Sequence, residues 1–122
     1  PWGRDGAVIK IMLLPTAILP TLRWLDESMR GSDYDVIGRA GVGVLVARLG
    51  GDVERQVRVI DGVRERLRAP AGSVVIVRGS DALEARVDPW GPIGDGLAVM
   101  RAIKRQFDPL RILNPGRGPG RL

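Results

Sequence analysis

The 122-residue chain has a hydrophobic content of 44% and a charged content of 27%, which is typical of one globular domain with a modest core. Its formal net charge is +5, and it contains no histidine and no cysteine. The composition therefore excludes imidazole general bases, cysteine nucleophiles and the common zinc sites.

The first predicted element is a strand over residues 7–14, because Ile9, Ile11 and Leu13 would share one face while Lys10 lies on the other. A helix is expected next, with Thr16 as its N-cap and the following proline still within the tolerated first turn. The buried stripe of this helix is Ile18, Leu22, Leu25 and Met29.

The middle of the chain predicts two short strands over residues 35–40 and 44–49. They form either a hairpin or one bent strand with a glycine bulge. Asp52 is the expected N-cap of a second amphipathic helix that runs to Leu67. A turn at residues 69–72 then leads to a β-branched strand over residues 73–77, which is expected to be central in the sheet.

The order strand, helix, strand, strand, helix, strand predicts an α+β, ferredoxin-like fold. This is a split β-α-β antiparallel sheet with two helices on one face. A C-terminal helix follows, whose apolar stripe includes Leu97, Met100 and Phe107, and an extended tail ends the chain. The apolar residues of the tail predict that it is docked, with Phe107 and Leu113 largely buried. The five residues after Arg117 lack such an anchor before Leu122 and are expected to be mobile.

Two charged residues and two prolines interrupt the most apolar region, residues 7–25, so no membrane span is expected and a cytoplasmic location follows by default. Among the carboxylates, Asp33 with Asp35, or Asp26 with Glu27, could pair as acid and base. Their positions at helix ends and turns favour capping and solvation instead, so the sequence assigns no catalytic residue.

The most specific stretch is residues 88–117, DPWGPIGDGLAVMRAIKRQFDPLRILNPGR. It combines W-G-P-x-G-D before a helix, L-x-x-M-R-x-I-K within it, and F-D-P-x-x-I-L-N-P-G-R after it. This combination resembles the C-terminal end of FAD-linked oxidases of the vanillyl-alcohol-oxidase superfamily, and it is most similar to the FAD-binding subunit of glycolate oxidase.

The resemblance implies that residues 1–122 are a single C-terminal cap domain of a larger flavoprotein, and the absence of an initiator methionine agrees with a piece of a longer chain. An N-terminal FAD-binding domain would hold most of the cofactor, FAD, and other oxidase subunits are implied as partners. The intact protein would be an oxidoreductase, an oxidase or dehydrogenase of a small 2-hydroxy acid. This part alone is expected to be inactive and to bind no FAD.

Four residues are candidates for the site that the resemblance implies. Asn114 and Arg117 flank a Pro-Gly turn and carry donors suited to a carbonyl, a carboxylate or a phosphate, and the resemblance implies contact with the flavin. Arg39, beside the glycines of residues 41–43, could bind a substrate carboxylate, and Trp90 could cover the substrate. The alternatives are a turn-capping Asn114, a Trp90 packed over the end of a sheet, and solvated arginines. Other branches of the superfamily carry histidines near residues 39–43; none is present here, so no metal is expected.

A different class of function remains open: a free-standing ferredoxin-like regulatory or basic nucleic-acid-binding module, or a purely structural interaction domain. Seventeen of the nineteen basic residues are arginine, but they are not gathered in one block. The strands over residues 7–14, 44–49 and 73–77 contain no aromatic residue on which bases could stack. No specific nucleic-acid binding is therefore expected.

Overall fold

The computed structural model describes residues 5–68 and 71–122, so the turn expected at residues 69–72 lies partly outside the described residues. The chain divides into two compact units, Pro1–Pro89 and Trp90–Leu122. None of the helices in the described ranges is long and apolar enough to cross a membrane. The two units are considered one at a time.

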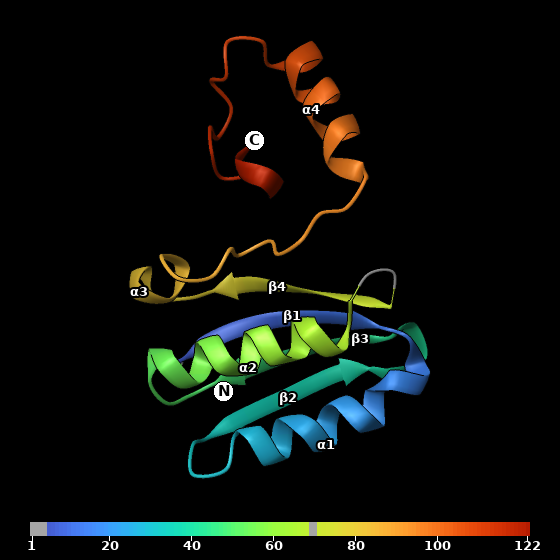
Figure 1. Ribbon diagram of the computed structural model, residues 1–122, viewed down its shortest axis with the longest axis vertical. Helices are drawn as coiled ribbons and strands as arrows, with labels where there is room; N and C mark the ends of the chain where they lie inside the picture. Colours follow the sequence, from blue (N-terminus) through green and yellow to red (C-terminus); the bar gives the residue numbers. More distant parts are fainter. Residues whose placement is uncertain (1–4, 69–70) are drawn as a thin grey trace. The chain divides into compact units, whose positions relative to one another are not determined.

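The first unit is built on one antiparallel sheet (Figure 1). Its four strands pair in the order β2-β3-β1-β4. In chain order, the elements of this unit are β1 (Ala7–Leu13), η1 (Pro15–Ala17), α1 (Ile18–Ser28), β2 (Tyr34–Arg39), η2 (Ala40–Val42), β3 (Val44–Leu49), α2 (Val53–Arg66), β4 (Gly72–Arg78) and α3 (Asp81–Glu84).

The sequence and pairing of these strands confirm the predicted ferredoxin-like α+β fold. The two middle apolar stretches are a hairpin, in which β2 pairs with β3 from Tyr34↔Leu49 to Arg39↔Val44. The expectation that the last strand is central was wrong, because β4 pairs only with β1 and forms an edge. A run of β-branched residues indicates that a strand is buried, not that it is central. An edge strand such as β4 can carry the same run, because the helices bury one of its faces.

The helix starts differ in how they are capped. Asp52 is the N-cap of α2, as predicted, and its carboxylate accepts a hydrogen bond of 2.9 Å from the Arg55 amide. Thr16 is not a cap, because Pro15 starts a short 3₁₀ turn and α1 begins only at Ile18. The predicted stripe of α1 is present, with Leu25 and Met29 fully buried.

The core of the first unit lies between one face of the sheet and the helices α1 and α2. Alternate residues of β1 enter it, and so do their partners on the neighbouring strands, because successive side chains of a strand point to opposite faces. Each fully buried aliphatic side chain contributes about 1.5–3 kcal/mol. The buried members are Ala7, Ile9, Ile11, Leu13, Leu25, Met29, Leu45, Ala47, Leu49, Val59, Ile60, Val63, Leu67, Val74, Ile76, Leu83 and Val87.

The second unit contains α4 (Gly96–Phe107) and η3 (Pro119–Arg121). The predicted helix is confirmed, but the predicted burial of the tail is wrong: Phe107 is 80% exposed and Leu113 is 65% exposed. One side of α4 is apolar, but no other described element of this small unit is large enough to cover that side. The chain end is also better anchored than expected, because the Leu122 carbonyl accepts hydrogen bonds from the amides of Gly116 and Gly118.

Candidate functional site

Within the first unit, α1 and α2 cover one face of the sheet, and the strand register shows which residues the other face presents. In one row across the strands, Lys10 lies between Val75 of β4 and Val46 of β3, with Ile37 of β2 beyond Val46. The next row contains Ser73, Met12, Val44 and Arg39. Met12 is 43% exposed and Ile37 is 55% exposed, so this open face is apolar and accessible.

Two cations, Lys10 and Arg39, stand on this apolar open face. Both side chains are exposed, and neither makes a salt bridge within the described part of the chain. Their strands are two strand spacings apart, which is about 10 Å across the sheet. Because both side chains are long and leave the same face, they can converge on one anion. The role of Arg39 in binding a carboxylate stays a prediction, and the register adds Lys10, which sequence analysis had not proposed for the site.

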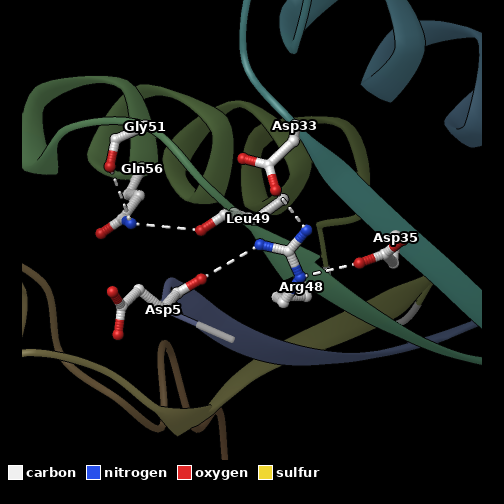
Figure 2. Close-up of polar contacts among 7 residues, drawn as sticks. All are labelled: Asp5, Asp33, Asp35, Arg48, Leu49, Gly51 and Gln56. Carbon is white, nitrogen blue, oxygen red and sulfur yellow. Dashed lines mark hydrogen bonds and ion pairs between the residues drawn. The ribbon is translucent and has the colours of Figure 1, made fainter. Parts of the chain in front are cut away.

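The open face also carries a buried cation, Arg48, at the position opposite Val8 and Asp35. Figure 2 shows its polar contacts with Asp5, Asp33 and Asp35. Only 1% of Arg48 is exposed. Its Nε donates to Asp35 Oδ2 at 2.7 Å, one terminal nitrogen donates to Asp33 Oδ2 at 2.6 Å, and the other donates to the Asp5 carbonyl at 3.0 Å. The hydrogen bond from Asp33, and then that from Asp35, raises the pKa of Arg48 above its ordinary value.

Three of the carboxylates that sequence analysis weighed as acid and base have contacts of this kind. Asp33 and Asp35 form salt bridges with Arg48, and these join the start of β2 to β3. Asp26 accepts a 2.6 Å hydrogen bond from the Tyr34 hydroxyl, which raises the pKa of that tyrosine. These three carboxylates are thus ion-pair or hydrogen-bond acceptors, and none of them is the N-cap of a described helix.

The open face ends at a tight turn that explains the glycines beside Arg39. Gly43 has φ of +65°, and a Cβ there would lie 1.9 Å from the Leu13 carbonyl oxygen. The same Gly43 accepts a 2.9 Å hydrogen bond from the Leu13 amide. Only glycine allows this close approach, which fixes the start of β3 against the end of β1. Arg39 pairs with Val44, the first residue of β3, and lies just before this turn.

The other three predicted site residues lie in the second unit. Trp90 is 40% exposed, and its Nε1 donates a 3.0 Å hydrogen bond to the Arg117 carbonyl. The Arg117 amide donates to the Asn114 carbonyl at 3.2 Å, and Asn114 has φ of +44°. The structure therefore brings Trp90 to the Asn114–Arg117 turn and leaves the side chains of Asn114 and Arg117 exposed, whereas Arg39 belongs to the first unit.

Asp108 organises this turn, and sequence analysis did not propose it as a site residue, since it noted the residue only as part of the motif over residues 107–117. Its carboxylate accepts hydrogen bonds from the amides of Ile112 at 2.8 Å and Leu113 at 3.0 Å, and pairs with Lys104 at 2.6 Å. The hydrogen bond from Lys104, aided by those from the two amides, holds the pKa of Asp108 below its ordinary value. The sequence signal that could have indicated this role is the Asp-Pro pair at residues 108–109, directly after the helix.

The described residues offer no group of three or more side chains that could hold a metal ion. Asn114 and Arg117 provide an amide and a guanidinium, which are donors of the kind that phosphate and flavin carbonyl oxygens accept. The donor set of the turn thus fits an anionic or carbonyl-bearing cofactor, and its exposure leaves it accessible.

Comparison with known protein families gives one match. Residues 93–117 match the family described as FAD linked oxidases, C-terminal domain. The matched segment contains α4 and the Asn114–Arg117 turn, so it supports the FAD-linked oxidase part of the resemblance found in the sequence. No curated protein and no solved structure matches the chain.

Proposed function

We propose that this chain is the cap domain of an FAD-dependent oxidase or dehydrogenase that acts on a small 2-hydroxy acid. The observation that carries the proposal is the family match over residues 93–117, because the matched segment holds the turn with cofactor-compatible donors. An N-terminal FAD-binding domain of the same protein would hold the flavin, with Asn114 and Arg117 adding donors to it. Other oxidase subunits are further proposed partners, in a cytoplasmic protein.

The open face of the first unit supports the substrate class. Arg39 can bind a carboxylate through two parallel N–H···O bonds, and Lys10 adds a second positive charge. The apolar residues between them, Met12 and Val46, would exclude water from a bound substrate and so strengthen these charge interactions. Trp90 stays a separate prediction of a substrate-binding residue.

FAD, when bound, supplies the hydride acceptor for oxidation of the α-carbon. The residues of this chain would bind the carboxylate and orient the α-carbon, and no described side chain is assigned as the base. For this reason the 122-residue chain alone is expected to be colourless and inactive.

The rival nucleic-acid-binding function lacks a stacking surface. The open-face residues of the two central strands are Val8, Lys10, Met12, Val44, Val46 and Arg48, none of which is aromatic. Arg48 is also buried and paired, so it cannot contact phosphate. Binding of single-stranded RNA should therefore be weak and lost at moderate salt.

The test uses the gene product that carries residues 1–122 together with the sequence preceding them. It should be yellow, and glycolate or lactate added without oxygen should bleach the flavin absorbance. Replacing Arg39 with alanine should raise KM for the hydroxy acid about 10- to 100-fold, as expected for loss of a charged hydrogen bond. Arg23→Ala, which removes an exposed arginine from α1 on the opposite side of the sheet, is the matched control.

Each part of the proposal can fail separately. A colourless gene product would contradict the FAD assignment. A yellow product that no 2-hydroxy acid reduces would contradict the substrate class while leaving the flavin in place. Equal effects of Arg39→Ala and Arg23→Ala would remove Arg39 from the substrate site.

A further inference from the structure

A groove lies on the helical side of the first unit, between α1 and α2, and the open face plays no part in it. Its volume is about 480 Å³, which is within the range of small-molecule sites. It is lined by Trp24, Glu27, Ser28, Arg30, Arg55, Arg58 and Val59.

Positive charge dominates this groove. Three guanidinium groups, those of Arg30, Arg55 and Arg58, face a single carboxylate, that of Glu27. Within the described ranges, the side chains of Arg30 and Arg58 make no salt bridge. One terminal nitrogen of Arg55 donates to the Arg30 carbonyl, so this guanidinium is held at the groove with donors left over.

The other carboxylates of the two helices and their ends are engaged elsewhere, so they do not neutralise the groove. Glu54 pairs with Arg86, Glu65 pairs with Arg68, Asp26 accepts from Tyr34, and Asp52 caps α2. The remaining carboxylate of α2, that of Asp61, is not among the residues that line the groove, and it interacts electrostatically with Arg64. The groove arginines thus keep a net charge that an anion from outside the chain could balance.

The groove also has an aromatic wall, the ring of Trp24. The six-membered edge of this ring lies against Gly62 of α2, where a Cβ would come within 2.3 Å of Trp24 Cη2. The guanidinium carbon of Arg66 lies 5.9 Å from the ring centroid, a cation–π distance. Glycine inside a helix costs about 1 kcal/mol relative to alanine, and here it makes the room that sets the ring between the helices.

We propose that the α1–α2 groove is a binding site for a small dianion with an aromatic ring, namely an aryl phosphate monoester. The arginines bind the phosphate, because planar guanidiniums match its oxygens bidentately and their summed charge favours a dianion over a carboxylate. The wall formed by Trp24 and Val59 contacts the ring. This site is separate from the one proposed for the hydroxy acid, since it lies on the other side of the sheet.

The test is calorimetric titration of the 122-residue chain with phenyl phosphate, benzoate, inorganic phosphate and phenol, at low and moderate salt. Phenyl phosphate should bind one per chain, at least tenfold more tightly than benzoate or inorganic phosphate, and phenol should not bind. Arg58→Gln should weaken phenyl phosphate at least tenfold. Arg39→Gln, with the same loss of charge on the open face, should change it less than twofold.

A second variant separates the ring from the charge. Trp24→Leu should reduce the preference for phenyl phosphate over inorganic phosphate while leaving the binding of inorganic phosphate unchanged. Circular dichroism checks that this variant keeps the fold. If it does not, the comparison of Arg58→Gln with Arg39→Gln decides the proposal alone. Absence of saturable binding would overturn the proposal. So would equal losses in Arg58→Gln and Arg39→Gln, because that result would reflect net charge alone, or benzoate binding as tightly as phenyl phosphate.

Discussion

The two units of this chain hold themselves together by different means. The first packs aliphatic side chains between a sheet and two helices, and Leu25, Ile60 and Leu49 are completely buried. The second keeps most of its large aliphatic side chains exposed, including Leu110 at 80% and Ile112 at 71%. Its described contacts are mainly polar ones around a turn.

Among the described residues, each unit nevertheless buries one charged side chain, Arg48 in the first and Asp108 in the second. Each nitrogen of the Arg48 guanidinium and each oxygen of the Asp108 carboxylate has at least one partner, as is usual for buried charges. In the first unit, the buried charge of Arg48 lies beside a hydrophobic core. In the second unit, the described contacts include no comparable core, and the hydrogen bonds of Asp108 are the main contacts that hold the turn. The comparison teaches that the first unit is stabilised by burial and the second by a small network of charge-assisted hydrogen bonds.

The largest expected effect tests burial directly with the same substitution in each unit. Leu25→Ala should lower the free energy of unfolding by about 3 kcal/mol, because it leaves a cavity in the core. Leu110→Ala should change it by less than about 0.5 kcal/mol, since the side chain is exposed. Chemical denaturation of both variants measures this, and similar losses would show that the second unit also depends on apolar packing.

A smaller effect is expected when the buried cation of the first unit is removed. Arg48→Gln should cost about 2 kcal/mol of unfolding free energy, because the Asp33 and Asp35 carboxylates then face each other without a cation. The control is Arg39→Gln on the same face of the sheet, which should cost less than about 0.5 kcal/mol. If the two losses are equal, the cluster around Arg48 contributes nothing beyond its surface charge.

The smallest effect is local and appears at low pH in the second unit. The pKa of Asp108 lies below its ordinary value of 3.8. The stability that the ionised Asp108 carboxylate contributes is therefore fully present above pH 3.8. It is lost as the pH falls through the lower pKa of the folded state. The amide resonances of Ile112 and Leu113 should shift with that midpoint in NMR spectra, and Asp108→Asn should abolish the shift. A midpoint above 3.8 would contradict the network.

Sequence periodicity predicted the first unit well because its pattern and its packing agree. Alternation in residues 7–13 indicated the face of β1 that enters the core, and the Asp52 cap indicated where α2 begins. It failed where local geometry depends on partners distant in the chain. Nothing near Arg48 in the sequence shows that two aspartates before and within β2 would neutralise it.

For the second unit, the same kind of pattern misled. The stripe on α4 predicts burial against something, but periodicity names no partner, and in this unit Val99 and Ile103 remain more than half exposed. Of the candidate site, Arg39 was found through its glycines, while Lys10 emerged only from the register that sets it on the same face. Cross-strand neighbours are fixed by pairing, which a single sequence does not contain.

The segment that ends at Pro89 closes one side of the sheet. The outward-facing amide of Ile76 on β4 donates 2.8 Å to the Pro89 carbonyl, and the Val74 carbonyl accepts from the guanidinium of Arg64 at 2.9 Å. Arg64 also donates to the Pro89 carbonyl, so Pro89 is bound both to β4 and to the arginine that contacts β4. Proline has no amide hydrogen and cannot pass the hydrogen-bond ladder on to another strand. Strand-by-strand polymerisation is thereby blocked at β4, and any sheet extension by a second molecule is directed to β2 at the opposite edge.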